Sequence, residues 1–233
     1  MAAHATDLVR RALAGSGVNL AASCDVAAYD ARAPETFRSS ALLPGARGVV
    51  VAGSAGPALW RAFRARMDAR PDLWDAPHPY DAFVAEILAR ADDALRAAGV
   101  RFLRFDAAFH APVRVDFVAL AQLVGLGASG PFGLLIHPEH GAWWALRGAW
   151  LVDADVSPSV ARPAPCEGCP APCIGGMQNA ASSILSATVE ARARCVVGQQ
   201  SRYDADQIAY HYDREATAAR LRRDPAARAG GGT

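Results

Sequence analysis

The spacing of apolar residues along the chain predicts alternating helices and strands. Apolar side chains recur on one face of residues 79–98, which indicates an amphipathic helix that ends before Gly99. The β-branched run at 48–53 is typical of a buried strand. The other expected elements are a helix from Thr6 to Gly15, a helix that starts at Pro57, helices at 113–124 and 203–223, and strands at 100–105, 133–137 and 143–152.

The composition indicates a folded chain. Of the 233 residues, 52% are hydrophobic and 20% charged, which is too apolar for a disordered protein. The fold class we expect is α/β (α+β), with a central sheet flanked by helices. We expect a core at 1–157, a Pro/Cys-rich metal or iron-sulfur segment at 158–200, a C-terminal helix packing on the core at 201–223, and a disordered tail at 224–233.

The charges exclude several classes of function. A net charge of +1 provides no field for nucleic acid, so no nucleic-acid partner is expected. Every basic residue is Arg, which excludes enzymes that depend on a lysine amine. Residues 117–136 carry no formal charge, but glycines and Pro131 interrupt them, so we expect no membrane span. The N-terminus lacks a secretion signal, and we expect a cytoplasmic protein.

Two neighbouring stretches are candidates for a binding site. Gly125, Gly127 and Gly130 match the spacing G-x-G-x-x-G, but they follow a helix rather than a strand. This order favours a close-packed turn beneath a ligand over a nicotinamide site, and a plain helix C-cap is the alternative. The signature segment, His137–Gly148 (HPEHGAWWALRG), offers wide apolar surface with a few polar groups, as a large planar cofactor requires. Tryptophans that simply belong to the core are the alternative.

Residues 129–148 resemble the signature of the CblC-type (MMACHC-like) cobalamin-processing proteins. Leu120-Ala-Gln122 and the Arg-Tyr-x-x-x-Gln-x-x-Tyr pattern at 202–210 resemble two further stretches of that family, and the similarity covers roughly 80 to 215. The central segment is also similar to the catalytic half of epoxyqueuosine reductases, a related corrinoid-dependent group.

The resemblance implies a nitroreductase-like fold that holds cobalamin with its lower base detached. It also implies removal of the upper axial ligand, by reductive loss of cyanide or by alkyl transfer to glutathione, with a thiol, FMN or a ferredoxin as electron donor. A homodimer is compatible with it. Arg147 and Arg202 match arginines that bind glutathione carboxylates, and Arg147 is also a catalytic candidate. The family's Tyr-rich insertion before the His-Pro strand is absent, which leaves corrin tail contacts and flavin use open. The cofactor-binding candidates are Gly127, Gly130, His137, Gly141, Trp143, Trp144, Arg147 and Arg202.

Four cysteines follow the signature segment. Cys166, Cys169 and Cys173 lie at short spacings, and Cys195 comes 22 positions later. In a reducing compartment this pattern indicates a metal site, either an iron-sulfur cluster or structural zinc, and unligated thiols are the alternative. The pattern resembles a shortened form of the epoxyqueuosine reductase cysteine region, without its cysteine-proline pair. Cys24 is expected to be a buried structural thiol.

Few acid–base candidates are present. Asp106 follows a predicted strand near the place where epoxyqueuosine reductases have a proton-donating aspartate, and a loop carboxylate is the alternative. Arg147 could instead pair with Asp153 or Glu139. His211 lies in a polar stretch and is expected to face solvent, while His110 is ambiguous.

The sequence therefore supports two classes of function. The first is a corrinoid-dependent oxidoreductase that reduces cobalamin or removes its upper ligand. The second is a non-enzymatic cobalamin carrier with structural zinc. An epoxyqueuosine-reductase-like corrinoid and iron-sulfur enzyme is a further alternative, although the chain has neither a second ferredoxin motif nor a basic surplus for phosphate contacts.

Overall fold

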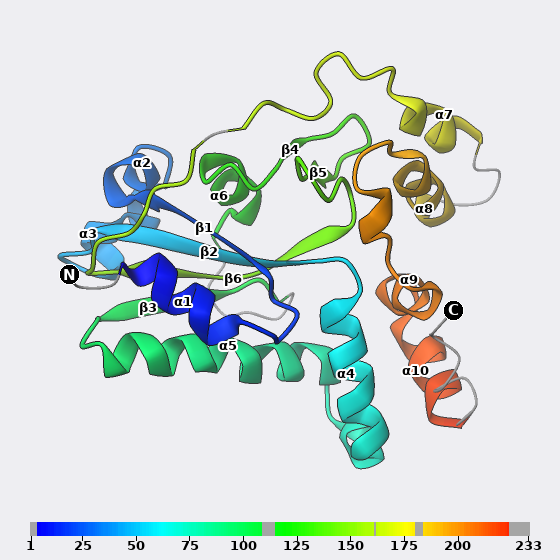
Figure 1. Ribbon diagram of the computed structural model, residues 1–233, viewed down its shortest axis with the longest axis horizontal. Coiled ribbons are helices and arrows are strands. Elements are labelled where there is room, and N and C mark those ends of the chain that lie inside the picture. The colour runs from blue at the N-terminus through cyan, green and yellow to red at the C-terminus, as the bar shows by residue number, and fades with distance from the viewer. Residues whose placement is uncertain (1–3, 109–114, 161, 180–183, 224–233) are drawn as a thin grey trace.

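The centre of the molecule is a four-stranded antiparallel sheet. The computed structural model describes residues 4–108, 115–160, 162–179 and 184–223. In this part of the chain the strand order is β1-β2-β6-β3 (Figure 1). The fold class is α+β with a central sheet flanked by helices, as the sequence predicts. The strands are β1 (Leu20–Asp25), β2 (Gly48–Ala55), β3 (Phe102–Asp106) and β6 (Trp144–Val152), and β4 (Ala128–Ser129) and β5 (Leu135–Ile136) form a separate short pair.

Helices cover both faces of the sheet. Figure 1 shows α1 and α5 along one face and α2 and α6 on the other. None of the described helices is long and apolar enough to cross a membrane. The α-helices are α1 (Ala5–Leu13), α2 (Val26–Asp30), α3 (Ser39–Leu42), α4 (Ala58–Ala69), α5 (Pro79–Ala97), α6 (Phe117–Leu123), α7 (Pro172–Asn179), α8 (Ile184–Arg194), α9 (Ala205–Tyr212) and α10 (Arg214–Arg223), and short 3₁₀ turns are η1 (Glu35–Phe37), η2 (Pro71–Asp75) and η3 (Gln199–Ser201).

Burial on both faces explains the apolar composition of β2. Val49 and Val51 pack with Leu120 of α6, whereas Val50 packs with the residues of α1 and α5 around Leu88. Successive side chains of a strand point to opposite faces, so a strand covered on both sides needs an apolar residue at every position. The run at 48–53 therefore has no polar alternation, and its assignment as a buried strand is confirmed.

Three expected elements differ from the structure. The strand expected at 133–137 shrinks to β5, because Gly130 and Gly133 close a turn that leaves two residues to pair with β4. The helix expected at 203–223 is two helices, since Asp213 is extended (φ −145°) and its carboxylate accepts a hydrogen bond from Ala216 N. The helix expected at 113–124 is α6, and residues 113–114 lie outside the described part.

Strand β1 and helices α2, α3, α7 and α8 are not among the elements expected from the sequence. The β1 sequence, LAASCD, has one large apolar residue and no β-branched residue, so only its pairing along β2 makes it a strand. The proline-rich stretch before α7 is irregular, as expected, up to Pro172. The expected domain boundaries stay a prediction. The tail expected at 224–233 and His110 lie outside the described residues.

Candidate functional site

A tight turn holds the signature segment. His137 and Gly141 pair through two backbone hydrogen bonds, His137 N to Gly141 O at 2.8 Å and Gly141 N to His137 O at 2.9 Å. The ring nitrogen Nδ1 of His137 accepts from the backbone N–H groups of Glu139 and His140, at 3.0 and 3.2 Å. Burial lowers the pKa of His137 to about 4, so the ring is a neutral acceptor that fixes the turn.

The two tryptophans that follow this turn have different surroundings. Trp144 lines a cavity of about 290 Å³, the signature cavity, whereas Trp143 is fully buried against Tyr203 and Arg192 and is not among the residues that line this cavity. Trp144 alone of the pair therefore lines the signature cavity, and contact of Trp143 with a cofactor stays a prediction. The signature cavity is lined by Val118, Ser129, Gly133, Leu134, Leu135, Ala142, Trp144, Ala145, Leu146 and Arg192.

The glycines at 127 and 130 act through close packing. A Cβ atom on Gly127 would lie 2.7 Å from the Trp144 ring, and one on Gly130 would lie 2.6 Å from Ile136. Trp144 is fixed further by a 3.0 Å hydrogen bond from its Nε1 to Leu135 O. Both glycines thus lie beneath the wall of the signature cavity, and this placement agrees with the expectation of a close-packed turn.

A second group of polar side chains lies around Trp143. We call it the buried polar cluster; it consists of Tyr80, Trp143, Arg147, Arg192, Tyr203 and His211. Arg147 donates from Nε to Ser54 Oγ at 2.8 Å, and its guanidinium carbon lies 5.2 Å from the centre of the Tyr80 ring. Its Nη2 atom and the Tyr80 hydroxyl are buried without a hydrogen-bond partner.

Arg192 of α8 completes this cluster. Its guanidinium carbon lies 4.8 Å from the ring centres of both Trp143 and Tyr203, and its Nη2 donates to Ala142 O at 2.7 Å. Its Nε atom is buried without a hydrogen-bond partner. Within the described part of the chain, neither Arg192 nor Arg147 forms an ion pair. The buried Arg192 and the half-buried Arg147 therefore lack a carboxylate partner, an arrangement that is costly unless an anion joins them.

His211 belongs to this cluster and does not face solvent, so that expectation is wrong. Its ring stacks on Tyr203, with centres 5.5 Å apart and an interplanar angle of 28°. Burial lowers its pKa to about 3, and the nearby Arg147, Arg192 and Arg214 lower it further. Several of its sequence neighbours are polar, but one face of α9 packs inward, and Gln207 and Tyr210 are buried on the same helix. No pattern in the sequence singled out His211, Tyr80 or Arg192.

Arg202 and Asp106 lie at the edges of the site. Arg202 is exposed, with its guanidinium carbon 5.7 Å from the Trp143 ring centre. Asp106 ends β3, pairs with Arg104 at 2.9 Å, and lines a cavity of about 60 Å³ together with Arg147. Leu146 lines both this small cavity and the signature cavity, so the two cavities adjoin.

The pairing of Arg147 with Asp153 or Glu139, which the sequence left open, is wrong. Asp153 instead pairs with Arg101, at 2.6 Å, and Glu139 pairs with Arg162. The two residues of each pair are 52 and 23 positions apart in the sequence, so the pattern of charges along the chain could not reveal these pairs. The guanidinium of Arg147 is thereby left available.

The four cysteines after the signature segment meet at one small cavity of about 20 Å³. Burial and the neighbouring thiols raise the pKa of Cys166 and of Cys173. Cys195 Sγ lies 3.4 Å from where a Cβ on Gly141 would be, so the cysteines adjoin the signature turn. As the side chains stand, the described residues hold no group of three or more His, Cys, Asp or Glu arranged to bind a metal ion. Cys24 is buried elsewhere, in β1, as expected, and burial raises its pKa to about 12.

Comparison with solved structures shows which fold this is. The chain is similar to a B12-trafficking protein CblC from C. elegans, a homologue of human MMACHC, with a TM-score of 0.66, 14% sequence identity, and 94% of each chain covered. The fold is that of a CblC-type protein. This confirms the similarity first seen in the sequence, at the level of the fold.

Epoxyqueuosine reductases are similar over part of their length. One bound to a transfer-RNA stem loop has a TM-score of 0.51 and 18% identity, with 72% of this chain and 50% of that chain covered. The enzyme from Streptococcus thermophilus has a TM-score of 0.50 and 14% identity, with 83% and 57% covered. The chain thus spans about half the length of these enzymes. No family model and no curated protein matches the sequence.

Proposed function

We propose that this protein binds cobalamin at the signature cavity and promotes removal of its upper axial ligand, with a thiol such as glutathione as the acceptor. Cobalamin, when bound, supplies the cobalt whose bond to the upper ligand is broken. The observation that carries the proposal is a pair of guanidinium groups, those of the half-buried Arg147 and the buried Arg192, that lack a carboxylate partner beside this cavity in a CblC-type fold.

The signature cavity fits part of a corrin. Its volume of about 290 Å³ is near the lower end of the range for small-molecule sites, about 300 to 1,000 Å³. The apolar wall of Trp144, Leu135 and Leu146 suits the edge of a flat macrocycle, and the remainder would extend over the exposed side chain of Val118. Gly127 supports this proposal, since its missing side chain leaves the space that Trp144 occupies.

The buried polar cluster suits the anionic end of a second substrate. A carboxylate placed there would accept from the unpartnered Nη2 of Arg147 and Nε of Arg192 and from the phenol of Tyr203. Charge-assisted hydrogen bonds of this kind are shorter and stronger than neutral ones. Arg202, exposed at 5.7 Å from the Trp143 ring centre, would meet the same ligand from the solvent side. Glutathione carries two carboxylates and a thiol, which this arrangement matches.

The primary experiment is the visible spectrum of methylcobalamin with increasing protein. If the cavity binds cobalamin with its lower base detached, the visible band shifts to shorter wavelength, because losing the nitrogen ligand raises the transition energy. Val118→Trp places a bulky ring at the exposed mouth of the signature cavity and should abolish the shift while the protein stays folded. An unchanged spectrum at saturating wild-type protein contradicts the proposal.

The role of the guanidinium groups is tested by thiol-dependent dealkylation. Arg147→Lys keeps the positive charge but loses the pair of parallel N–H donors that a guanidinium offers to a carboxylate. Arg192→Ala removes the N–H donors of the second guanidinium. Each should lower the rate by about ten- to a hundredfold, since a hydrogen bond to a charged group contributes about 1.5 to 3 kcal/mol. The cobalamin spectrum should be retained. Arg61→Ala, which removes an exposed ion pair with Asp204, is the control. Normal rates of thiol-dependent dealkylation in both Arg147→Lys and Arg192→Ala would exclude a role of these two guanidinium groups in binding the thiol.

We further propose that the four cysteines hold an iron-sulfur cluster that delivers electrons to the corrin, with zinc as the alternative for a carrier. The support is the convergence of the thiols on one cavity beside Gly141, although they do not form a ligand set as they stand. Anaerobically purified protein should be brown and contain iron and sulfide. Each of Cys166→Ser, Cys169→Ser, Cys173→Ser and Cys195→Ser should lower the iron content, and Cys24→Ser should not. Equal metal content in all five variants excludes the site.

A further inference from the structure

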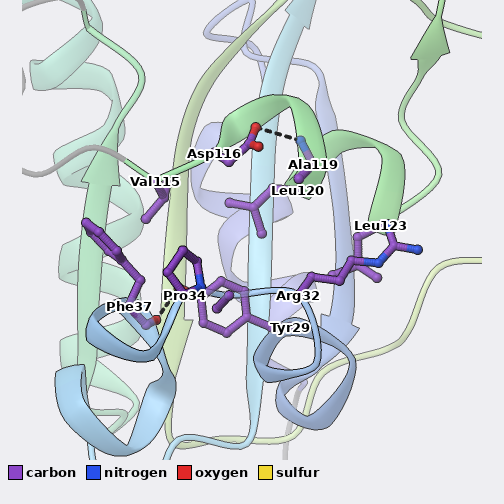
Figure 2. A pocket seen from close by; sticks show the side chains of 10 residues that line it. Tyr29, Arg32, Pro34, Phe37, Val115, Asp116, Ala119, Leu120 and Leu123 are labelled. Carbon is purple, nitrogen blue, oxygen red and sulfur yellow. Dashed lines mark hydrogen bonds between the residues drawn. The ribbon is translucent and has the colours of Figure 1, made fainter.

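A second cavity lies on the other side of helix α6. Its volume is about 330 Å³, and it opens between α6, α2 and η1 (Figure 2). Helix α6 separates it from the signature cavity: Val118 lines the signature cavity, whereas Ala119 and Leu120 line this one. The α6 cavity is lined by Tyr29, Arg32, Ala33, Pro34, Phe37, Val115, Asp116, Ala119, Leu120 and Leu123.

The walls of the α6 cavity are apolar and include two aromatic rings. Leu120 is buried at one side, and the Tyr29 ring is buried at the other. The Tyr29 hydroxyl donates to Phe37 O at 2.6 Å, which satisfies the one polar atom of that ring. Figure 2 shows Phe37 and Val115 together at one end of the cavity. These walls favour a flat apolar body and leave few polar atoms to bind a sugar or a nucleotide.

One unpaired charge lies at the other end. Figure 2 shows Arg32 beside Leu123, away from Phe37. Arg32 is exposed, and within the described part of the chain its guanidinium forms no hydrogen bond and no ion pair. Asp116 also lines the cavity, and its carboxylate accepts from Ala119 N at 2.9 Å at the start of α6. Figure 2 shows this carboxylate away from Arg32, so the charge at the Arg32 end of the apolar slot is positive.

From this arrangement we infer that the α6 cavity is a binding site for an aromatic acid, a compact ring system that carries one carboxylate or sulfonate. The ring lies between the Tyr29 and Leu120 sides, and the anionic group meets the Arg32 guanidinium at the mouth. This site is independent of the cobalamin proposal, because it shares helix α6 with the signature cavity but no lining residue.

The probe is 8-anilinonaphthalene-1-sulfonate, whose fluorescence rises in an apolar site. We expect saturable binding to the folded protein, weaker in high salt because the charge at Arg32 is exposed. Naphthalene-2-carboxylate should displace the probe, whereas the uncharged 2-naphthalenemethanol and the flexible decanoate should displace it poorly. Displacement by decanoate but not by naphthalene-2-carboxylate overturns the assignment of an aromatic ligand.

Two kinds of variant test the location. Arg32→Ala should weaken binding by about two- to fivefold, the effect typical of one exposed charge contact, and remove the salt dependence. Arg11→Ala, an exposed arginine of α1, is the matched control and should change neither. Ala119→Phe and Ala33→Phe fill the cavity from opposite sides and should abolish binding, with the methylcobalamin shift retained. Undiminished binding in either variant, once its circular dichroism shows it to be folded, overturns the site.

Discussion

At the scale of single residues, glycines decide how the signature turn meets the cysteine segment. A Cβ on Gly141 would lie 2.0 Å from Val197 O, and one on Gly198 would lie 2.0 Å from the backbone carbon of His140. Both glycines also have positive φ, +56° and +77°. The two loops therefore interlock through backbone contact, which places the cysteines against the signature segment.

Gly141→Ala tests this contact. Gly133→Ala is the matched control, because Gly133 has φ +81° and nothing within 4 Å of its added Cβ. The control should cost about 1 to 2 kcal/mol of unfolding free energy from backbone strain alone. Gly141→Ala should cost about 1 to 3 kcal/mol more, because the backbone of Val197 has to move. Urea unfolding measures the free energy of unfolding of both variants. Equal losses would show that the close approach of Gly141 to the Val197 backbone does not contribute to stability.

His211 should make the protein sensitive to acid. Its folded-state pKa, about 3, lies below the ordinary value of 6.5, so the unfolded chain binds the proton more strongly. The stabilising effect is complete above pH 6.5 and is lost as the pH falls towards 3. Unfolding free energy should decrease by about 1 to 2 kcal/mol between pH 6.5 and 5 on account of this residue. His211→Gln should reduce that dependence, and exposed His4→Gln should not; identical pH profiles would contradict the buried neutral ring.

At the scale of elements, the break between α9 and α10 depends on Asp213. Its Oδ1 atom accepts from Ala216 N at 3.1 Å and caps the second helix. Because Leu221 of α10 packs in the same core cluster as Trp74, the cap helps to hold α10 in place.

Asp213→Ala should therefore lower stability by about 1 kcal/mol, the usual loss for an N-cap, while Asp213→Ser should retain most of it. Glu215→Ala, an exposed position of the same first turn, serves as the control. Thermal unfolding of these three variants measures the loss of stability in each. A loss in Glu215→Ala that equals that in Asp213→Ala would attribute the effect to negative charge near the helix start rather than to the cap.

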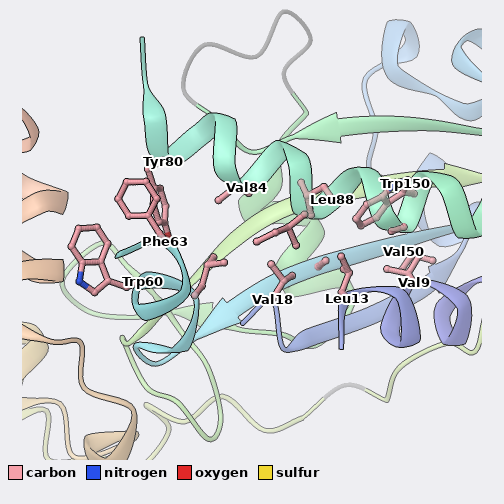
Figure 3. Close-up of a cluster of buried hydrophobic side chains, with 14 of the residues drawn as sticks. Val9, Leu13, Val18, Val50, Trp60, Phe63, Tyr80, Val84, Leu88 and Trp150 are labelled. Atoms are coloured by element: carbon pink, nitrogen blue, oxygen red, sulfur yellow. The ribbon is translucent and has the colours of Figure 1, made fainter. Parts of the chain in front are cut away.

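At the scale of the whole molecule, the C-terminal helices close the main hydrophobic core. Tyr210 of α9 packs on Trp60 and Tyr80, with ring centres 5.0 and 6.0 Å apart, and the same residues contact Phe63. Figure 3 shows Trp60, Phe63 and Tyr80 together at one end of this core. The buried polar cluster also takes Tyr203 and His211 from this part of the chain. Core and candidate site thus need the same C-terminal segment.

A chain that ends at residue 200 should lose cooperative unfolding, because Trp60 and Phe63 would become exposed to water. Its tryptophan emission should shift to longer wavelength. A chain that ends at residue 223 keeps every contact described above and should unfold like the full chain. Cooperative unfolding of the shorter chain at an unchanged midpoint would mean that the core is complete and stable without residues 201–223.

The sequence by itself determined the elements whose signal is local. These elements are the apolar helix face of 79–98, the β-branched run at 48–53 and the glycine turn before the signature segment. Each depends on residues a few positions apart, so its pattern can be recognised from the sequence alone. The similarity of 129–148 to CblC-type proteins likewise lies within one continuous stretch.

Only the tertiary structure decided the features that join distant segments. Trp143 packs against Tyr203 and Arg192 while Trp144 lines the signature cavity, and His211 turns inward because α9 meets Tyr80 and Tyr203. Arg192 lies 45 positions after Arg147 in the sequence, yet α8 brings it into the same cluster. The burial and the partners of a side chain depend on which distant segments pack around it, and these contacts leave no periodic pattern in the sequence.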